Sequence, residues 1–364
     1  MNSETETQNP KLKIQNSKQK NLNRLKIAAV VFTILGLGLF AYFVYSVGVW
    51  EILAGIARIG LGGFLILQFL YFLRIAARAM AWKMCVPATH KLDVRDTLPA
   101  VIMGEALSSL IPLGILISGT AKAVAVKKRV PLVIGLSSVA TENLFYSLVT
   151  GLFISLGAVA FLRSFELAQG WVLTIDFLIG TIFLMIFIGV FMVVFQWHWA
   201  TSLSNWLYNR NFFTRFLKTG RFHVKQFEDL IYGFYRQYPR RFLPIVLLQT
   251  SYHLIGILEV WFVLSRISEV LPNLYTAFLL ESISRLITIV FKLIPFLIGV
   301  DEAGAQFVTE TLALGAGIGV TLAIVRKGRI LFWTAIGLIL IIRREFSFKE
   351  INNVGRSEEW RAES

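Results

Sequence analysis

The stretch that decides the fold is RLITIVFKLIPFLIGVDEAGAQF, at residues 285–307. Most of its side chains suit lipid, but it also contains four charged residues and two helix breakers: Arg285, Lys292, Asp301, Glu302, Pro295 and Gly299. Pro295 ends a helix because proline lacks a backbone donor, and Gly299 permits a turn. Non-helical backbone is tolerated at membrane depth only where it is buried in protein or lines a wet cavity. The stretch therefore predicts a broken helix beside an internal polar cavity.

The composition around this stretch is typical of a membrane protein with several spans. Hydrophobic residues make up 56% of the 364 residues and charged residues only 16%, and the mean hydropathy is +0.66. A bilayer core needs about 20 apolar residues per crossing helix. The spans should be helices because lipid offers no hydrogen-bond partner to exposed backbone groups. The sequence therefore predicts an all-α integral membrane protein.

The charged and reactive residues argue against several other classes of function. The formal net charge is +14, but Lys and Arg lie in patches between apolar runs. That pattern favours membrane topology and anionic lipid head groups over nucleic acid. The single cysteine, Cys85, excludes an internal disulfide and a cysteine-based metal site. We find no phosphate loop, metal-binding His pair or nucleophile–base pattern, so we expect no metal, no cofactor and no catalytic set.

Apolar runs and basic patches outline a polytopic membrane domain at 27–343. Residues 1–26 hold six Lys/Arg and two Glu and are predicted to be a disordered cytoplasmic tail, and 344–364 a short second one. Residues 197–241 contain eight Lys/Arg, and within this stretch the apolar residues between Phe213 and Tyr238 recur at three- and four-residue steps. This predicts a cytoplasmic amphipathic helix on the membrane surface. Six full spans are predicted, at 27–49, 59–81, 132–162, 172–196, 242–267 and 317–342.

Two further apolar segments are each broken in the middle. The first contains LIPLGILISGTAKA at 110–123 and the second LIPFLIGVDEAGAQ at 293–306. Each has an Ile-Pro turn, a Gly-containing run, the start of a new helix and then a long span. Their predicted turn residues are Pro112 and Gly119 in the first, and Pro295 and Gly299 in the second.

The distribution of basic residues predicts how these two segments enter the membrane. Segment 97–121 has basic patches on both sides, so it should enter from the cytoplasm and return to it. Segment 274–315 begins on the side poor in Lys and Arg, so it should enter from outside. We therefore predict two re-entrant hairpins in an inverted repeat, an arrangement with which many transporters build a substrate site. In the alternative topology, residues 274–294 cross fully and the basic tail lies outside.

Glu281, Arg285, Thr288 and Lys292 fall on one face of the helix predicted from residue 274. Glu281 and Arg285 have the spacing of an ion pair. A charge at the bilayer centre costs roughly 2.5–3.5 kcal/mol, so it normally faces an interior partner or water. The three charges do not neutralise one another. This favours a polar helix face that binds an anion over a polar face that only packs against neighbouring helices. Lys292 lies nearer the turn and is the expected chief phosphate contact, with Arg285 partly structural.

Other polar residues in the spans allow both a binding and a packing interpretation. Glu142 and Glu105 are costly in lipid, which favours a role in a cavity. Arg74 and Arg78 end a span, where snorkelling to the interface is the default. Asp301 suits an N-cap and Glu302 a first helical turn, although either could instead pair with a basic group. One set of polar residues is expected to pack between helices: Gln249, His253, Gly256 and Glu259. A second set is expected to lie at the interface: Arg326, Lys327 and Arg329.

Short motifs in both halves point to a known family. GVDEA at 299–303 contains a Gly-x-x-Glu turn, which singles out Glu302, and GRILFW at 328–333 is similar to Arg-Leu-Leu-x-x-Trp, with its arginine at Arg329. In SVATENLFYSL at 138–148, Glu142 is kept from a Glu-Arg-x-x-Asp element, but Asn143 and Tyr146 replace the other two residues. After the first turn, Gly119 and Lys122 remain and Thr120 replaces an acid. On these motifs, residues 58–343 resemble the membrane region of lysylphosphatidylglycerol synthases, a family of flippase-like prokaryotic proteins.

The resemblance implies transport of a lipid across a prokaryotic cytoplasmic membrane, with both termini cytoplasmic. Some relatives also carry a soluble aminoacyl-transfer domain, for which this chain has no room, so we expect it not to make the aminoacyl lipid. The expected substrate is an amphipathic, anionic or glycosylated phospholipid. A membrane enzyme acting on a polyprenyl-phosphate lipid, or a non-transporting partner of a glycosyltransferase or other lipid-modifying enzyme, remains the alternative, and the oligomeric state stays open. The candidate substrate-binding residues are Glu105, Lys122, Glu142, Arg285, Lys292, Glu302 and Arg329.

Overall fold

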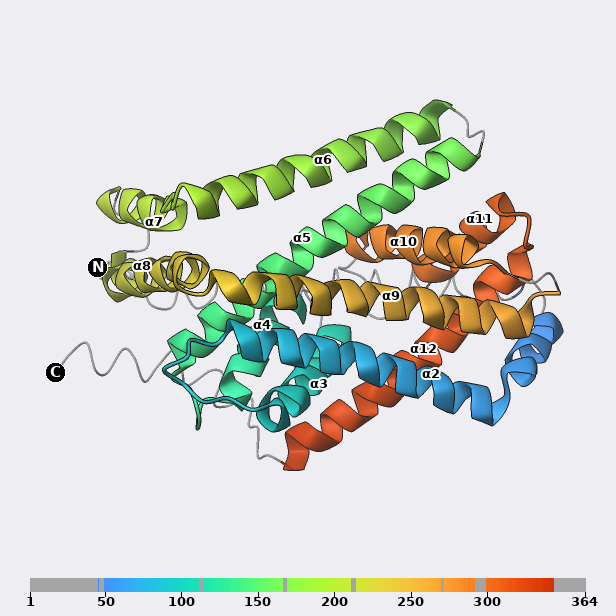
Figure 1. Cartoon of the computed structure of the whole chain (residues 1–364), viewed down its shortest axis with the longest axis horizontal. Coiled ribbons are helices and arrows are strands. Elements are labelled where there is room, and N and C mark those ends of the chain that lie inside the picture. The colour runs from blue at the N-terminus through green and yellow to red at the C-terminus, as the bar shows by residue number, and fades with distance from the viewer. Residues whose placement is uncertain are drawn as a thin grey trace, which may run out of the picture.

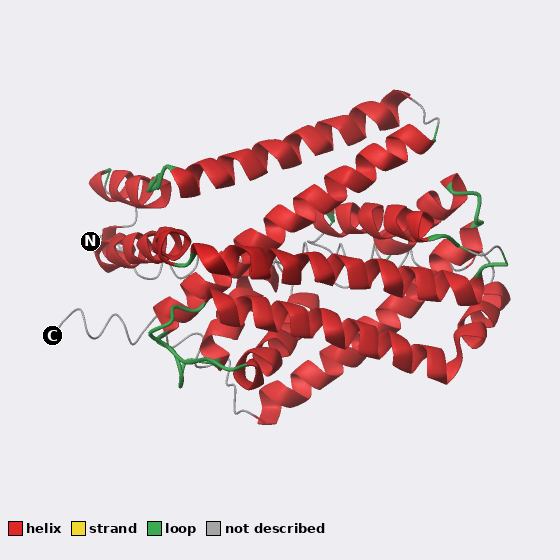
Figure 2. Cartoon of the chain, in the orientation of Figure 1, coloured by secondary structure: helices red, strands yellow, loops and turns green. Residues whose placement is uncertain are grey.

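The computed structural model describes residue 45 and the ranges 49–110, 114–165, 169–210, 214–269, 272–291 and 299–343. Every regular element in these ranges is a helix, as Figure 2 shows, which confirms the predicted all-α class. Within the same ranges, four segments are long and apolar enough to cross a membrane: Ile56–Cys85, Leu132–Ser164, Val172–Met192 and Pro239–Ile267. The predicted span at 27–49 and both predicted tails lie almost entirely outside the described residues.

The observed helices follow the apolar runs of the sequence, because an uninterrupted apolar run leaves the backbone no other way to satisfy its hydrogen bonds in lipid. In chain order they are α2 (Val49–Cys85), α3 (Val94–Leu110), α4 (Gly114–Ala125), α5 (Leu132–Ser164), α6 (Gln169–Val194), α7 (Trp199–Asn209), α8 (Thr214–Gln237), the short 3₁₀ helix η1 (Pro239–Arg241), α9 (Phe242–Ile267), α10 (Leu274–Val290), α11 (Val300–Thr311) and α12 (Ala316–Arg343). The amphipathic helix predicted from the apolar residues between Phe213 and Tyr238 is α8, and the segment 197–241 also holds the short helix α7, which was not predicted.

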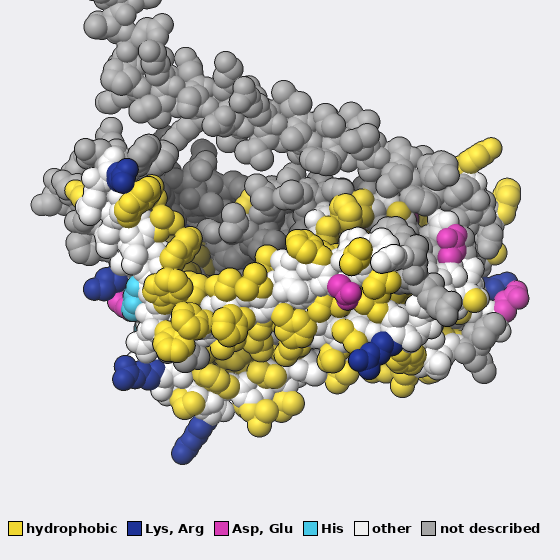
Figure 3. Space-filling view, turned by 90° about the horizontal axis from the view of Figure 1, so that it is seen from above, with side chains coloured by type: hydrophobic (Ala, Val, Ile, Leu, Met, Phe, Trp, Pro, Cys, Tyr) yellow, Lys and Arg dark blue, Asp and Glu magenta, His cyan; other side chains and the backbone are white. Residues whose placement is uncertain are grey.

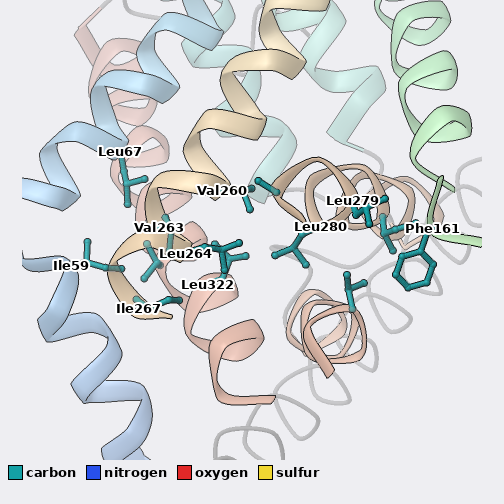
Figure 4. Packing of buried hydrophobic residues seen from close by; sticks show 14 of the residues in the cluster. Ile59, Leu67, Phe161, Val260, Val263, Leu264, Ile267, Leu279, Leu280 and Leu322 are labelled. Carbon is teal, nitrogen blue, oxygen red and sulfur yellow. The ribbon is translucent and has the colours of Figure 1, made fainter. Parts of the chain in front are cut away.

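The bundle is built around α2 and α9, which pack against each other, while α12 contacts both (Figure 1). Between these three helices and α10 lies a buried apolar cluster, shown in Figure 4, to which α2 contributes Leu67, α9 Leu264, α10 Leu280 and α12 Leu322. Each of these four leucines is at most 1% exposed. Such close packing matters in a membrane because lipid tails are as apolar as leucine and give helices little reason to associate.

Each broken segment forms a pair of helices that pack against each other, α3 with α4 and α10 with α11. The α3–α4 pair follows the end of α2 at Cys85 and returns to the start of α5 at Leu132. The α10–α11 pair follows the end of α9 at Ile267 and returns to the start of α12. In Figure 1 the end of α2 and the start of α5 lie towards the left of the bundle. The end of α9 and the start of α12 lie towards the right. The two helix pairs therefore open towards opposite ends of the bundle.

Helix α6 stands apart from the rest of the bundle, and its main helix contact is with α5 (Figure 1). Only 6% of its most apolar window is buried inside the protein, so a large part of the helix surface is available to lipid. Figure 3 shows the described part of this face as a broad band of hydrophobic side chains, with charged side chains mostly towards the two ends of the molecule.

Helix α8 holds the far end of α6 through polar contacts. The Glu228 carboxylate accepts hydrogen bonds from the backbone N–H groups of Ala200 and Thr201, at 2.9 and 3.1 Å, and so caps the start of α7. The Tyr232 hydroxyl donates to the carbonyl of Trp197 at 2.8 Å. These bonds fix the corner between α6 and α7 on α8.

Glycines set how closely α12 approaches both helix pairs. A methyl group at Gly319 would meet the backbone carbonyl of Ala305 in α11, and one at Gly337 would meet Ala106 and the carbonyl of Ile102 in α3. At Gly328 it would meet only the Phe64 ring, at an ordinary contact distance of 3.5 Å. Small residues permit such close backbone approach between membrane helices.

We therefore expect Gly319→Ala and Gly337→Ala each to destabilise the protein by about 1–3 kcal/mol, as overpacking typically does. Gly328→Ala, in the same helix, is the matched control and should be neutral or slightly stabilising, because alanine favours helix by roughly 0.4–1 kcal/mol over glycine. Thermal unfolding of the three purified variants in one detergent measures the difference. Equal melting temperatures for all three would show that the approach of α12 is not tight.

Candidate functional site

Two buried arginines one helical turn apart on α2, Arg74 and Arg78, form the centre of the polar interior. Arg74 is 1% exposed and the Arg78 side chain 12% exposed. Both guanidinium groups pair with carboxylates of other helices. The expectation that these arginines snorkel to the interface is therefore wrong, because partners within the bundle satisfy them where they stand.

The first group of charges, the Arg78 cluster, comprises Arg78, Lys122, Glu105 and Glu142. The Arg78 guanidinium donates two hydrogen bonds to the Glu142 carboxylate, at 3.2 and 3.3 Å, and one to Glu105 at 3.5 Å. Gln249 also donates to Glu142, at 2.9 Å. Lys122 is 3% exposed and its stem lies against Gly104, where an added methyl group would meet it. The cluster thus joins two cations to two carboxylates from α2, α3, α4 and α5.

The second group, the arginine cluster, comprises Arg74, Arg285, Arg326, Arg329, Glu259 and Glu281. The Glu281 carboxylate accepts from three guanidinium groups: Arg285 at 3.0 Å, Arg74 at 3.2 Å and Arg326 at 2.5 Å. Glu259 pairs with Arg74 at 3.0 Å and also with Arg329. Helices α2, α9, α10 and α12 are thereby joined through charge-assisted hydrogen bonds, which are about twice as strong as neutral ones.

The third group, the Lys327 cluster, lies at the start of α11. The ammonium of Lys327 is 2.6 Å from the Glu302 carboxylate and 3.8 Å from that of Asp301. The other Glu302 oxygen accepts from the backbone N–H of Gly299 at 2.8 Å. Gly299, with φ of 83°, is the N-cap residue, so the assignment of Asp301 as the cap is wrong. A left-handed backbone at this position favours glycine, which has no Cβ to clash.

Tyrosine rings cover the guanidinium groups and connect the first two clusters. The Tyr252 ring centre lies 4.3 Å from the Arg74 guanidinium and 5.4 Å from that of Arg285. The Tyr71 ring lies 4.2 Å from Arg329, and the Tyr71 hydroxyl donates to Glu105 at 3.0 Å. Sequence reasoning missed both tyrosines. A signal was available for Tyr71, because it lies three residues before Arg74 on the same face of α2.

A cavity of about 1280 Å³ opens beside the Arg78 cluster, between α5 and α6. Its polar end is lined by Arg78, Glu105 and Lys122, together with hydroxyl and amide side chains of Ser108, Ser118, Asn143 and Tyr146. Its opposite wall is apolar and is formed mainly by Leu148 and Ile154 of α5 and by Leu178, Ile182, Met185 and Ile186 of α6. The cavity is therefore charged at one end and hydrocarbon-like along the other.

Residues of α8 line one side of the cavity, among them Tyr232, Tyr235 and Arg236. Burial raises the pKa of the Tyr232 and Tyr235 hydroxyls above the usual range. Both phenols therefore stay neutral at physiological pH, and Arg236 supplies the charge on this side.

The predicted site residues fall into all three clusters. Glu105 and Lys122 line the cavity. Glu142 accepts hydrogen bonds from Arg78, which also lines the cavity. Arg285 and Arg329 belong to the arginine cluster, and Glu302 to the Lys327 cluster. Gly119 also lines the cavity, but its prediction as a turn residue is wrong, because it lies inside α4. Three predicted residues, Lys292, Pro112 and Pro295, lie outside the described residues.

The pairings within the site differ from those predicted. We expected Glu142 and Glu302 to pair with Arg285, Lys292 and Arg329, or to meet a cationic head group; among the described residues, their partners are Arg78 and Lys327. The predicted pair Glu281–Arg285 is confirmed. Glu259, for which polar packing between helices was predicted, joins Arg74 of α2 to Arg329 of α12.

Comparison with known proteins places the chain in a family. The family model of the lysylphosphatidylglycerol synthase TM region matches residues 26–337. A search of curated proteins and a search of solved structures each give no match. The matched range includes all three charged clusters and both walls of the cavity, so the chain belongs to the lysylphosphatidylglycerol synthase TM region family.

Proposed function

We propose that the protein moves an amphipathic phospholipid, with an anionic or glycosylated head group, across the cytoplasmic membrane. The observation that carries this proposal is the cavity between α5 and α6, which has charges at one end and an apolar wall along the other. A lipid has the same division, with a polar head and hydrocarbon chains. Membership of a membrane family with flippase-like relatives agrees with this function.

The two ends of the cavity would bind different parts of the lipid. Lys122 and Arg78 are placed to contact a phosphate, because both line the polar end and cations form strong hydrogen bonds with phosphate oxygens. Glu105 and Glu142 hold Arg78 when no lipid is bound. The acyl chains would lie against Leu148 and the apolar residues of α6. Since α6 contacts mainly α5, chains could enter from the bilayer beside it.

The arginine and Lys327 clusters would contribute to the same path. Arg285 and Arg329 remain candidate contacts for an anionic group, and Lys292 remains a prediction. Glu302 holds Lys327 at the start of α11, and this pair is a candidate gate on the far side of the arginine cluster.

The proposed topology has six full spans and two re-entrant helix pairs, α3–α4 and α10–α11, that enter from opposite faces. It is supported by the way these pairs open towards opposite ends of the bundle (Figure 1). It is also supported by the exposed basic residues Lys127, Lys128 and Arg129, which lie between α4 and α5 and match a cytoplasmic loop. Both termini would then be cytoplasmic.

Single cysteines test this topology in a Cys85→Ser background. A membrane-impermeant maleimide added to intact cells should label Asn273→Cys and Ala313→Cys, on the proposed outer side. It should label Lys128→Cys and Arg343→Cys only after the membrane is permeabilised. Labelling of Arg343→Cys in intact cells would show that residues 274–294 cross fully.

Lipid movement can be tested with purified protein in liposomes that contain a fluorescent anionic phospholipid. We expect Lys122→Met to slow movement by about tenfold or more, because a hydrogen bond to a charged group contributes roughly 1.5–3 kcal/mol. Lys128→Met is the matched control: it lies six residues away but is exposed, and it should move lipid at the wild-type rate.

The same assay separates transport from the alternative functions. A transporter leaves the mass of the labelled lipid unchanged, whereas an enzyme acting on a polyprenyl-phosphate lipid changes it. Wild-type protein that moves no lipid would contradict the proposed function. A Lys122→Met variant that moves lipid as fast as wild type would contradict the proposed head-group site.

A further inference from the structure

The arginine cluster contains more positive than negative charge. Its four guanidinium groups, Arg74, Arg285, Arg326 and Arg329, have two carboxylate partners, Glu259 and Glu281. The two carboxylates are each 3% exposed or less, and the most exposed of the arginine side chains, Arg285, is 17% exposed. The effective cost of an unpaired ion in a protein interior is several kcal/mol. Among the described residues, two positive charges in this cluster therefore lack a counter-charge.

The other two clusters do not share this excess. The Arg78 cluster has two cations and two carboxylates, and the Lys327 cluster has one cation and two carboxylates. The excess is thus confined to the place where α2, α9, α10 and α12 meet.

Two guanidinium N–H groups in the cluster also lack an acceptor. The Nε atoms of Arg74 and Arg329 are buried, and within the described residues neither has a hydrogen-bond partner. Both arginines bind the same carboxylate, Glu259, and both face the Tyr71 ring, with guanidinium-to-centroid distances of 5.7 and 4.2 Å. A buried donor left without an acceptor costs about 1–3 kcal/mol. An aromatic ring attracts a cation, but it carries no net charge and cannot neutralise one.

We propose that the arginine cluster is an anion site that takes a phosphate-type oxyanion. Such an anion supplies both missing features, a negative charge and several acceptor atoms, and the planar guanidinium group matches its geometry. Arg285 is the most exposed member, and the next residue on α10, Leu286, lines the cavity. We place the entry of the anion on this side, next to the cavity; only this route rests on the proposed function.

Anion binding can be measured without any transport, as a shift of thermal unfolding of the full chain in a neutral detergent. Sodium phosphate is compared with sodium chloride at equal ionic strength, and dioctanoyl phosphatidic acid with dioctanoylglycerol, which lacks the phosphate. We expect the phosphate compounds to raise the melting temperature by several degrees, with a rise that grows with the logarithm of concentration. A response to inorganic phosphate identifies a free anion as sufficient, and a response to phosphatidic acid alone identifies a lipid phosphate.

Variants locate the site. Arg285→Met and Arg329→Met should each weaken the apparent affinity by about tenfold or more, since each removes a charge-assisted contact. Arg95→Met, which changes an exposed cation on α3, should leave the affinity unchanged. No stabilisation by either phosphate compound, or equal stabilisation of all three variants, would overturn the proposal.

The charge excess also predicts the stability of the protein without the anion. Arg285→Met should then melt no lower than wild type, because it lowers the positive excess by one charge and leaves Glu281 paired with Arg74 and Arg326. Glu281→Gln, one helical turn away, should melt clearly lower, because it removes the partner of three arginines. If Arg285→Met melts as low as Glu281→Gln in phosphate-free buffer, Arg285 is a required counter-ion and the anion site is wrong.

Discussion

The structure depends on one constraint: a charge inside a membrane helix must find its partner on another helix. Glu281 shows this most clearly, because its carboxylate is shared by arginines of α2, α10 and α12. Removing one partner of a buried ion pair typically costs 3–5 kcal/mol. The carboxylate therefore fixes where α10 lies between α2 and α12, and α9 is held in the same way through Glu259.

The broken segments follow from this constraint. A segment divided into two packed helices can have both ends at the same end of the bundle and still bring charges to its centre (Figure 1). The breaks allow α3 and α4 to present Glu105 and Lys122, and α10 and α11 to present Glu281 and Glu302, from opposite ends of the bundle. Helix α6 packs mainly against α5, and the cavity lies between these two helices. The same charges thus stabilise the fold and form the polar end of the site.

Much of the fold could be predicted from the sequence. Apolar run length gave the helices from α2 onwards, because in lipid a run of this kind has only one way to satisfy its backbone. The turn at Gly299 was predicted and is the N-cap of α11, whereas Gly119 lies inside α4. The Glu281–Arg285 pair followed from its four-residue spacing. Family membership, too, was recognised from short motifs such as GVDEA and is confirmed.

Partners across the bundle could not be predicted. Arg74 lies 185 residues from Glu259 and 207 from Glu281, and no periodicity within a helix links positions so far apart. For the same reason Arg74 and Arg78 were expected to snorkel, since only the packing of α9, α10 and α5 around α2 makes a buried position tolerable. The cavity was expected near Pro295, but the described residues place it between α5 and α6, where residues of the SVATENLFYSL motif line it.

The central claim is that the space between α5 and α6 holds a lipid with its head at the Arg78 cluster. The most direct measurement is an electron cryo-microscopy structure of the protein in nanodiscs that contain anionic phospholipid. The account predicts a lipid in the cavity, with a phosphate within hydrogen-bonding distance of Lys122 or Arg78 and its chains along Leu148 and Met185. A cavity filled by protein side chains, with lipid bound only on the outer surface of the bundle, would contradict it.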